Sequence, residues 1–176
     1  INQMLIDMYA HPETVIFNEF RMQKSIVDLV MFNGHSRAFE IKTEYDTTRR
    51  LSGQLVDYTR VFQQCYVVIP KHMQETYERE IPPYIGIILL IDNNGCLTLK
   101  EARPAVENKN IDVCMMMKCL RTKEYENIVI EEFGVVVMCT GTFCQTYERI
   151  ILQFFQMNYF VIRLTVFWTC NKYIME

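Results

Sequence analysis

The most constraining feature of the sequence is a pair of apolar runs with charged residues at their centres. Residues 25–30 read Ser-Ile-Val-Asp-Leu-Val, and residues 38–42 read Ala-Phe-Glu-Ile-Lys. β-Branched and aromatic residues favour strands, and the Asn-Gly pair at positions 33 and 34 favours a tight turn between them. The runs over 25–32 and 38–44 therefore predict a β-hairpin.

The charged residues in these runs predict either an ion-pair network or an active site. Strand side chains alternate between faces, so Glu40 and Lys42 share one face while Phe39 and Ile41 point to the other. Burying such charges is costly unless they pair with each other or bind a metal. If Asp28, Glu40 and Lys42 lay together on one face of the sheet, each of the three charges would have a partner.

The length of the hairpin loop decides whether that convergence can occur. A regular two-residue Asn-Gly turn would place Asp28 opposite Phe39, on the face away from Glu40. A loop of odd length restores the shared face, because a one-residue change of register flips every side chain. We therefore expect a three-residue loop over 32–34, with its glycine in the left-handed region and Asp28 opposite Ala38, diagonal to Glu40.

Apolar spacing and turn residues predict the other elements up to residue 103. In chain order they are a helix over 4–9, a strand over 14–22, a helix over 49–63 with its N-cap within 46–48, a strand over 65–69, a helix over 73–81, and strands over 85–91 and 96–100. The helix over 49–63 has an apolar stripe of Leu51, Leu55, Tyr58 and Phe62, and Gln54 is a neighbour of Tyr58 on it. Alternating strands and helices predict an α/β or α+β sheet covered by helices.

The pattern changes after residue 103. Residues 111–120, 124–133 and 142–156 look helical, and the tail over 159–168 is apolar and aromatic. An arginine interrupts the tail, which is too polar and too broken for a membrane span, so no membrane association is expected. The aromatic side chains should instead pack on the core or on a second copy of the chain, forming a homodimer through the C-terminal region.

Charge and cysteine content narrow the class of protein. The net charge of −3 gives no broad cationic field, so nucleic-acid binding would depend on local patches. The seven cysteines are an odd number and lack metal-site spacing, and we expect no signal peptide. Free thiols in a reducing, cytoplasmic setting are therefore expected.

The order of these residues resembles the PD-(D/E)XK nuclease superfamily, and more closely its small stand-alone bacterial and phage members. The residues that carry the resemblance are Glu19, Asp28, Glu40-Ile41-Lys42 on consecutive strand-like runs, and then Gln54 and Tyr58 on a helix. Val27 stands where the motif usually has proline. The resemblance covers about residues 1–103, so we expect a nuclease-like core over 1–103 and a mainly helical extension over 104–176.

The resemblance implies a restriction-endonuclease-like fold, with a mixed central sheet flanked by helices, and a metal-dependent nuclease that cleaves DNA rather than RNA. Mg²⁺ or Mn²⁺ would be held by Asp28, Glu40 and the backbone carbonyl of Ile41. Lys42 would orient the attacking water and stabilise developing negative charge. Glu19 would act through a water or at a second ion.

Four further residues receive roles from the same resemblance. Gln54 and Tyr58 would fix the site or contact the phosphate backbone, and Arg49 and Arg50 at the helix start are candidate phosphate contacts. Replacing Glu40 with glutamine or Lys42 with alanine should abolish cleavage with little change in stability.

Three other readings of the sequence remain open. The charged residues could form a plain cross-strand ion pair at a sheet edge. The chain could be a catalytically inactive nuclease-fold module that binds nucleic acid or regulates, or a structural or assembly protein of a mobile element.

Overall fold

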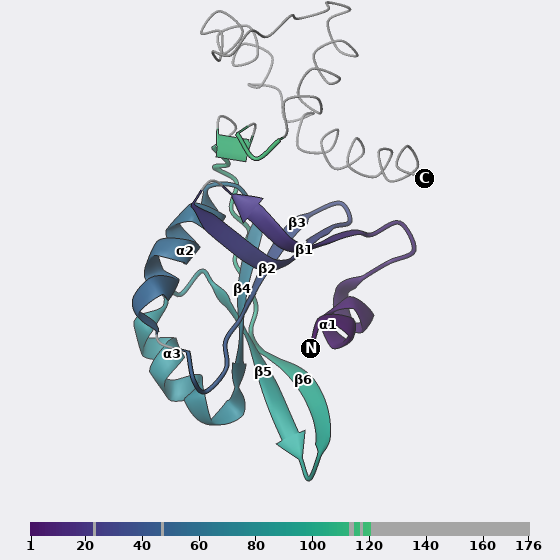
Figure 1. Cartoon of the computed structure of the whole chain (residues 1–176), viewed down its shortest axis with the longest axis vertical. Helices are drawn as coiled ribbons and strands as arrows, with labels where there is room; N and C mark the ends of the chain where they lie inside the picture. The colour runs from purple at the N-terminus through teal and green to yellow at the C-terminus, as the bar shows by residue number, and fades with distance from the viewer. Residues whose placement is uncertain (23, 47, 113–114, 117, 121–176) are drawn as a thin grey trace, which may run out of the picture.

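The structure, a computed structural model, describes residues 1–176 except 23, 47, 113–114, 117 and 121–176. It contains a six-stranded sheet in which the strands lie in chain order (Figure 1). The strands are β1 (Val15–Met22), β2 (Ser25–Phe32), β3 (Ser36–Ile41), β4 (Gln64–Pro70), β5 (Gly86–Asn93) and β6 (Cys96–Arg103). The helices are α1 (Asn2–Tyr9), α2 (Leu51–Thr59) and α3 (Gln74–Glu80), with short 3-10 turns at Thr48–Arg50 and Lys71–Met73.

The sheet is mixed. Strands β1, β2 and β3 are antiparallel neighbours, β3, β4 and β5 run parallel, and β6 returns antiparallel to β5. Each parallel step needs a crossover, and α2 and α3 lie on the two crossovers. The predicted α/β core with a mixed central sheet is therefore confirmed.

Helices cover both faces of the sheet and create two hydrophobic cores. Helices α2 and α3 lie on one face and α1 on the other (Figure 1). The predicted apolar stripe of α2 is fully buried in the first core: Leu51, Leu55 and Tyr58, with Phe62 just beyond the helix end. In the second core, Leu5 of α1 packs with side chains of β2 and β3.

Helix α2 is shorter than predicted and is not capped by Asp46. It ends at Thr59 instead of near residue 63, and a 3-10 turn precedes it. The Asp46 carboxylate instead accepts hydrogen bonds from the backbone N–H and the hydroxyl of Thr43, at 2.8 and 2.7 Å. Asp46 therefore closes the turn that leaves β3.

The hairpin between β2 and β3 has the predicted odd loop, one residue later than predicted. Phe32 pairs with Ser36, which leaves the loop over 33–35 with Gly34 at a φ of 87°. Phe32 stays in the strand because its ring packs against the first core. The predicted pairing of Asp28 with Ala38 is wrong, since Val30 is the residue opposite Ala38.

The segment after β6 packs back onto the C-terminal end of α2. The backbone N–H of Asn108 donates to the carbonyl of Gln63 at 2.7 Å, and that of Asp112 to the carbonyl of Arg60 at 2.8 Å. Most of the predicted extension over 104–176, including the helices over 124–133 and 142–156, the aromatic tail and any homodimer contact it makes, lies outside the described residues. Among the described helices, none is long and apolar enough to cross a membrane.

The backbone of the hairpin loop gives a first prediction. A Cβ at Gly34 or at Gly53 would meet no atom within 4 Å, but only Gly34 has a positive φ. Gly34→Ala should therefore lower the free energy of unfolding by about 1 kcal/mol, whereas Gly53→Ala should raise it by about 0.5–1 kcal/mol, since Gly53 lies in helix α2. Urea unfolding of both variants measures this, and equal effects of the same sign would contradict the described loop.

Candidate active site

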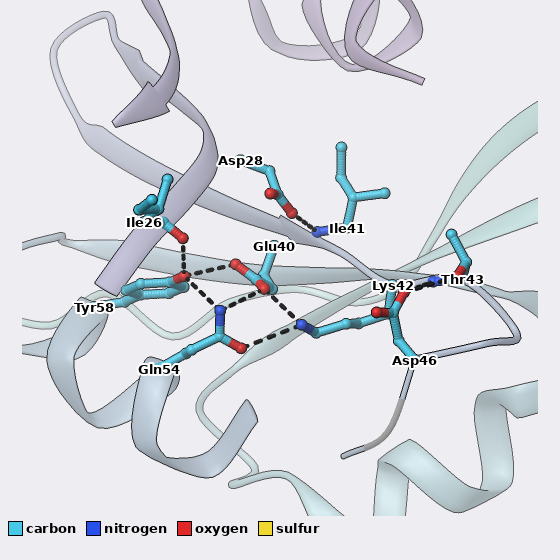
Figure 2. A network of polar contacts seen from close by, with 9 residues as sticks. All are labelled: Ile26, Asp28, Glu40, Ile41, Lys42, Thr43, Asp46, Gln54 and Tyr58. Atoms are coloured by element: carbon cyan, nitrogen blue, oxygen red, sulfur yellow. Dashed lines mark hydrogen bonds and ion pairs between the residues drawn. The ribbon is translucent and has the colours of Figure 1, made fainter. Parts of the chain in front are cut away.

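The candidate site lies where β2 and β3 separate. The ladder between the two strands runs from the Phe32–Ser36 pair to the Leu29–Phe39 pair and then ends. Beyond it, the backbone N–H of Ile41 donates to Oδ2 of Asp28 at 2.7 Å. A side-chain carboxylate thus takes the place of a carbonyl of β2, and we call this unpaired stretch of β2 and β3 the gap; Figure 2 shows the polar side chains near it.

An irregularity in β1 and β2 accompanies this gap. Val27 packs in the first core, on the side of α2, and Leu29 packs in the second core, on the side of α1. In a regular strand, residues two apart share a face. The change of face occurs at Asp28. Glu19, opposite Asp28 by the register of the flanking pairs, has a positive φ of 52°, and the Glu19–Asp28 pair is missing from the ladder. The local twist therefore frees Asp28 from the regular alternation of β2.

The carboxylate of Glu40 is the centre of the polar network. Glu40 is 2% exposed, at the end of β3. Its Oε1 accepts hydrogen bonds from Nζ of Lys42 at 2.7 Å and from Nε2 of Gln54 at 2.8 Å. Its Oε2 accepts one from the hydroxyl of Tyr58 at 2.6 Å. Strand β3 and helix α2 thus meet at this carboxylate, and Lys42 supplies the opposite charge (Figure 2).

The hydroxyl of Tyr58 connects the two separated strands. It lies 2.7 Å from the backbone carbonyl of Ile26 in β2 and 2.6 Å from Glu40 in β3. Burial and the neighbouring carboxylate of Glu40 raise the pKa of Tyr58 above its usual value, so the phenol keeps its proton. That one proton serves one acceptor at a time. Tyr58 can therefore donate to either side of the gap, to the carbonyl of Ile26 or to the carboxylate of Glu40.

The environment of Asp28 favours a positively charged ligand. Burial is the largest influence and raises the pKa of Asp28, the hydrogen bond from Ile41 lowers it, and the charge of Glu40 raises it further. The net shift is upward. Within the described part of the chain, Oδ1 of Asp28 has no hydrogen-bond partner. The site thus holds a half-buried carboxylate with an oxygen to spare.

The donor set fits a divalent cation with few protein ligands. Mg²⁺ prefers hard oxygen ligands and keeps several waters, so two carboxylates can suffice. Asp28 offers an oxygen, and the backbone carbonyl of Ile41 is next to the Glu40 carboxylate in sequence. The described residues contain no group of three or more His, Cys, Asp or Glu side chains able to hold a metal, so Glu19 does not complete a three-acid cluster.

The structure brings together most of the predicted site residues. Hydrogen bonds join Glu40, Lys42, Gln54 and Tyr58, and Asp28 lies beside this group, where it accepts a hydrogen bond from the backbone N–H of Ile41, the residue between Glu40 and Lys42. Glu19 is exposed on β1, and Arg49 and Arg50 are exposed in the 3-10 turn before α2. A role for Glu19 through a water, and phosphate contacts by the two arginines, stay predictions.

The ion-pair alternative is only half right. Lys42 and Glu40 do form an ion pair at 2.7 Å, but both side chains come from one segment of the chain, and their exposed fractions are 10% and 3%. Strand β3 is the third of six and not an edge strand. The pair is therefore not the exposed edge pair that this alternative assumed.

Sequence reasoning missed two contacts that frame the site. One is the backbone carbonyl of Ile26, which carries no side-chain signal. The other is a hydrogen bond from the hydroxyl of Ser25, at the start of β2, to the carboxylate of Asp57 on α2. The available hint was that Asp57 precedes Tyr58 on α2 and so lies near the same part of the sheet.

The position of Asp28 generates the second prediction. Its carboxylate accepts the hydrogen bond of Ile41, yet burial penalises its charge. Asp28→Asn keeps an acceptor oxygen and removes the charge, so stability at pH 7 should be unchanged or higher. Asp28→Ala leaves the Ile41 N–H without this acceptor and should cost about 1–3 kcal/mol. Urea unfolding of both variants measures the difference, and an asparagine variant as unstable as the alanine variant would contradict the described contact.

Comparison with known proteins places the chain in a phage family. The profile of a family described as bacteriophage P4 protein cII matches residues 1–159. Protein cII of Enterobacteria phage P4 is 29% identical over 97 residues, which are 55% of this chain and 35% of that protein. The chain thus spans about a third of the length of that relative. A solved structure of a protein of unknown function from Silicibacter pomeroyi is 12% identical, with a TM-score of 0.44 over 69% of this chain and 82% of that one. By the family match, the chain belongs to the bacteriophage P4 protein cII family.

Proposed function

We propose that this protein is a metal-dependent phosphodiesterase of the PD-(D/E)XK type that cleaves DNA with Mg²⁺ or Mn²⁺. The observation that carries the proposal is the buried Glu40–Lys42 ion pair at the gap between β2 and β3, with the Asp28 carboxylate bound to the backbone N–H of Ile41 between them in sequence. Buried or half-buried carboxylates are costly in a sheet unless they pair with a cationic group, bind a metal or serve a reaction, and the described structure gives Asp28 no cationic hydrogen-bond partner. The fold assignment that accompanies this proposal is restriction-endonuclease-like.

The residues of the site have distinct tasks under this proposal. A phosphodiester is an anion that water attacks, and a bound divalent cation supplies charge neutralisation and a more acidic water. Asp28 and Glu40 would hold the cation, with the carbonyl of Ile41 as a third ligand. Lys42 would orient the attacking water and stabilise the negative charge that develops on the phosphate oxygens.

Gln54 and Tyr58 are positioning residues in this proposal. Both donate hydrogen bonds to the Glu40 carboxylate, at 2.8 and 2.6 Å, so they point into the protein instead of toward a phosphate backbone. Phosphate contact is left to exposed residues, of which Arg49 and Arg50 precede α2. Such local contacts are needed because the chain has a net charge of −3.

One observation favours a second candidate, an inactive nuclease-fold module that binds nucleic acid or regulates. The Glu40 charge is already matched by Lys42, and each of its oxygens already accepts a hydrogen bond. A site of this kind could persist for stability alone. Cation binding and cleavage distinguish the two candidates.

The test of the proposal is a cleavage panel with the whole chain. Single-stranded, double-stranded and branched DNA, and RNA, are incubated with Mg²⁺ or Mn²⁺. The wild-type protein should cleave DNA, and Glu40→Gln and Lys42→Ala should each lose at least about 100-fold in rate, because each removes a group used in the reaction. Glu13→Gln, a change at an exposed acid, is the control. Wild-type rates in either site variant would refute the assignment.

The structure changes the stability expected of one of these variants. Sequence analysis led us to expect little effect from either, but Lys42 and Glu40 are both largely buried. Removing one partner of a buried ion pair leaves an uncompensated charge and costs about 3–5 kcal/mol. Lys42→Ala should therefore unfold at lower temperature than the wild-type protein, and its activity must be measured where circular dichroism shows it folded.

A further inference from the structure

The hydrogen bonds of Glu40 put Lys42 in competition with a divalent cation. Oε1 accepts from Lys42 and Gln54, and Oε2 accepts from Tyr58. These bonds take three of the roughly four acceptor positions of a carboxylate. Lys42 is the only one of the three donors that carries charge, at 2.7 Å from Oε1.

We infer that Lys42 is an internal competitor of the metal ion, which lowers the affinity of the site for Mg²⁺ or Mn²⁺. A cation that binds at Oε1 must replace the lysine ammonium or the amide of Gln54. A cation that uses the remaining position on Oε2 still lies beside the ammonium and is repelled by it. In both positions, the positive charge of Lys42 lowers the affinity of the site for the cation.

The charge of Lys42 also attracts the other proposed ligand, Asp28. The lysine therefore already supplies part of the positive charge that the two carboxylates require. A cation gains only the remainder, so its affinity is lower than the two acids alone would give.

This arrangement assigns Lys42 a second role that rests on the proposed function. When a cation binds Glu40 in place of Lys42, the three N–H donors of the lysine ammonium become free to bind the substrate. Metal binding and the freeing of Lys42 are then one coupled event. A plain structural role predicts the opposite of competition, because losing a residue that holds Glu40 in place would weaken metal binding.

Gln54 supports the competing position of the lysine. Its Oε1 accepts a hydrogen bond from Nζ of Lys42 at 3.2 Å, while its Nε2 donates to Glu40. Removing this amide frees one acceptor position on Glu40 and loosens the lysine, without removing a charge. Gln54→Met should therefore tighten metal binding in the same direction as loss of Lys42, and by less.

The experiment is a calorimetric titration of Mn²⁺ into the metal-stripped whole chain. Lys42→Met keeps the unbranched stem and removes the charge, and we expect the Kd for Mn²⁺ to fall about tenfold relative to wild type. Lys100→Met, the same change at an exposed position of β6, should leave the Kd unchanged. The rise in melting temperature on adding Mn²⁺ should also be larger for Lys42→Met than for wild type.

The outcomes separate this inference from the proposed function. A Kd for Lys42→Met that equals or exceeds the wild-type value overturns the competition, even where the wild-type protein binds Mn²⁺ and cleaves DNA. A wild-type protein that neither binds Mn²⁺ nor cleaves overturns both. If Lys42→Met does not fold, Gln54→Met decides, and a Kd no smaller than the wild-type value then overturns the competition.

Discussion

The rest of the structure depends on the ion pair and hydrogen bonds of one buried carboxylate, that of Glu40. A carboxylate that is 2% exposed is strongly unfavourable unless its charge and its oxygens are matched. Lys42 matches the charge from the same segment, and α2 contributes Gln54 and Tyr58, one helical turn apart. The rotation of α2 over the sheet must bury its apolar stripe and also direct these two polar groups inward.

The gap between β2 and β3 is closed by the same side chains that form the candidate site. Where the ladder ends, the backbone N–H of Ile41 donates to Asp28, and the hydroxyl of Tyr58 lies within hydrogen-bond distance of both the carbonyl of Ile26 and the carboxylate of Glu40. Buried backbone groups need such partners, so the separated strands are stable only with these side chains present. Structure and proposed chemistry therefore draw on one set of residues, and changes to the site are expected to affect stability as well.

Much of this arrangement follows from sequence patterns with a short period. The alternation in residues 38–42 correctly placed Glu40 and Lys42 on one face, and the requirement for an odd loop correctly fixed the relative face of the two strands. The spacing of the apolar stripe correctly gave the buried face of α2. Strand alternation, loop length and helical spacing all depend on residues close together in the chain, so they can be predicted from the sequence.

The errors have tertiary causes. The loop lies one residue later than expected because the ring of Phe32 packs in the core. The N-cap of α2 was expected within residues 46–48, but Asp46, the first of them, bonds to Thr43 instead, and the sequence does not decide between these two nearby partners. The change of face at Asp28 accompanies a positive φ at Glu19, which a period-two pattern cannot reveal in a residue other than glycine.

The most direct test of the account is where Mn²⁺ binds on the folded protein. In a two-dimensional amide NMR spectrum, a paramagnetic ion broadens the signals of the residues nearest to it. If Mn²⁺ binds at the candidate site, a substoichiometric amount should broaden the amide signals of Asp28, Glu40 and Ile41 first. Broadening confined to exposed acids such as Glu13 and Glu75, with those three signals unchanged, would contradict it.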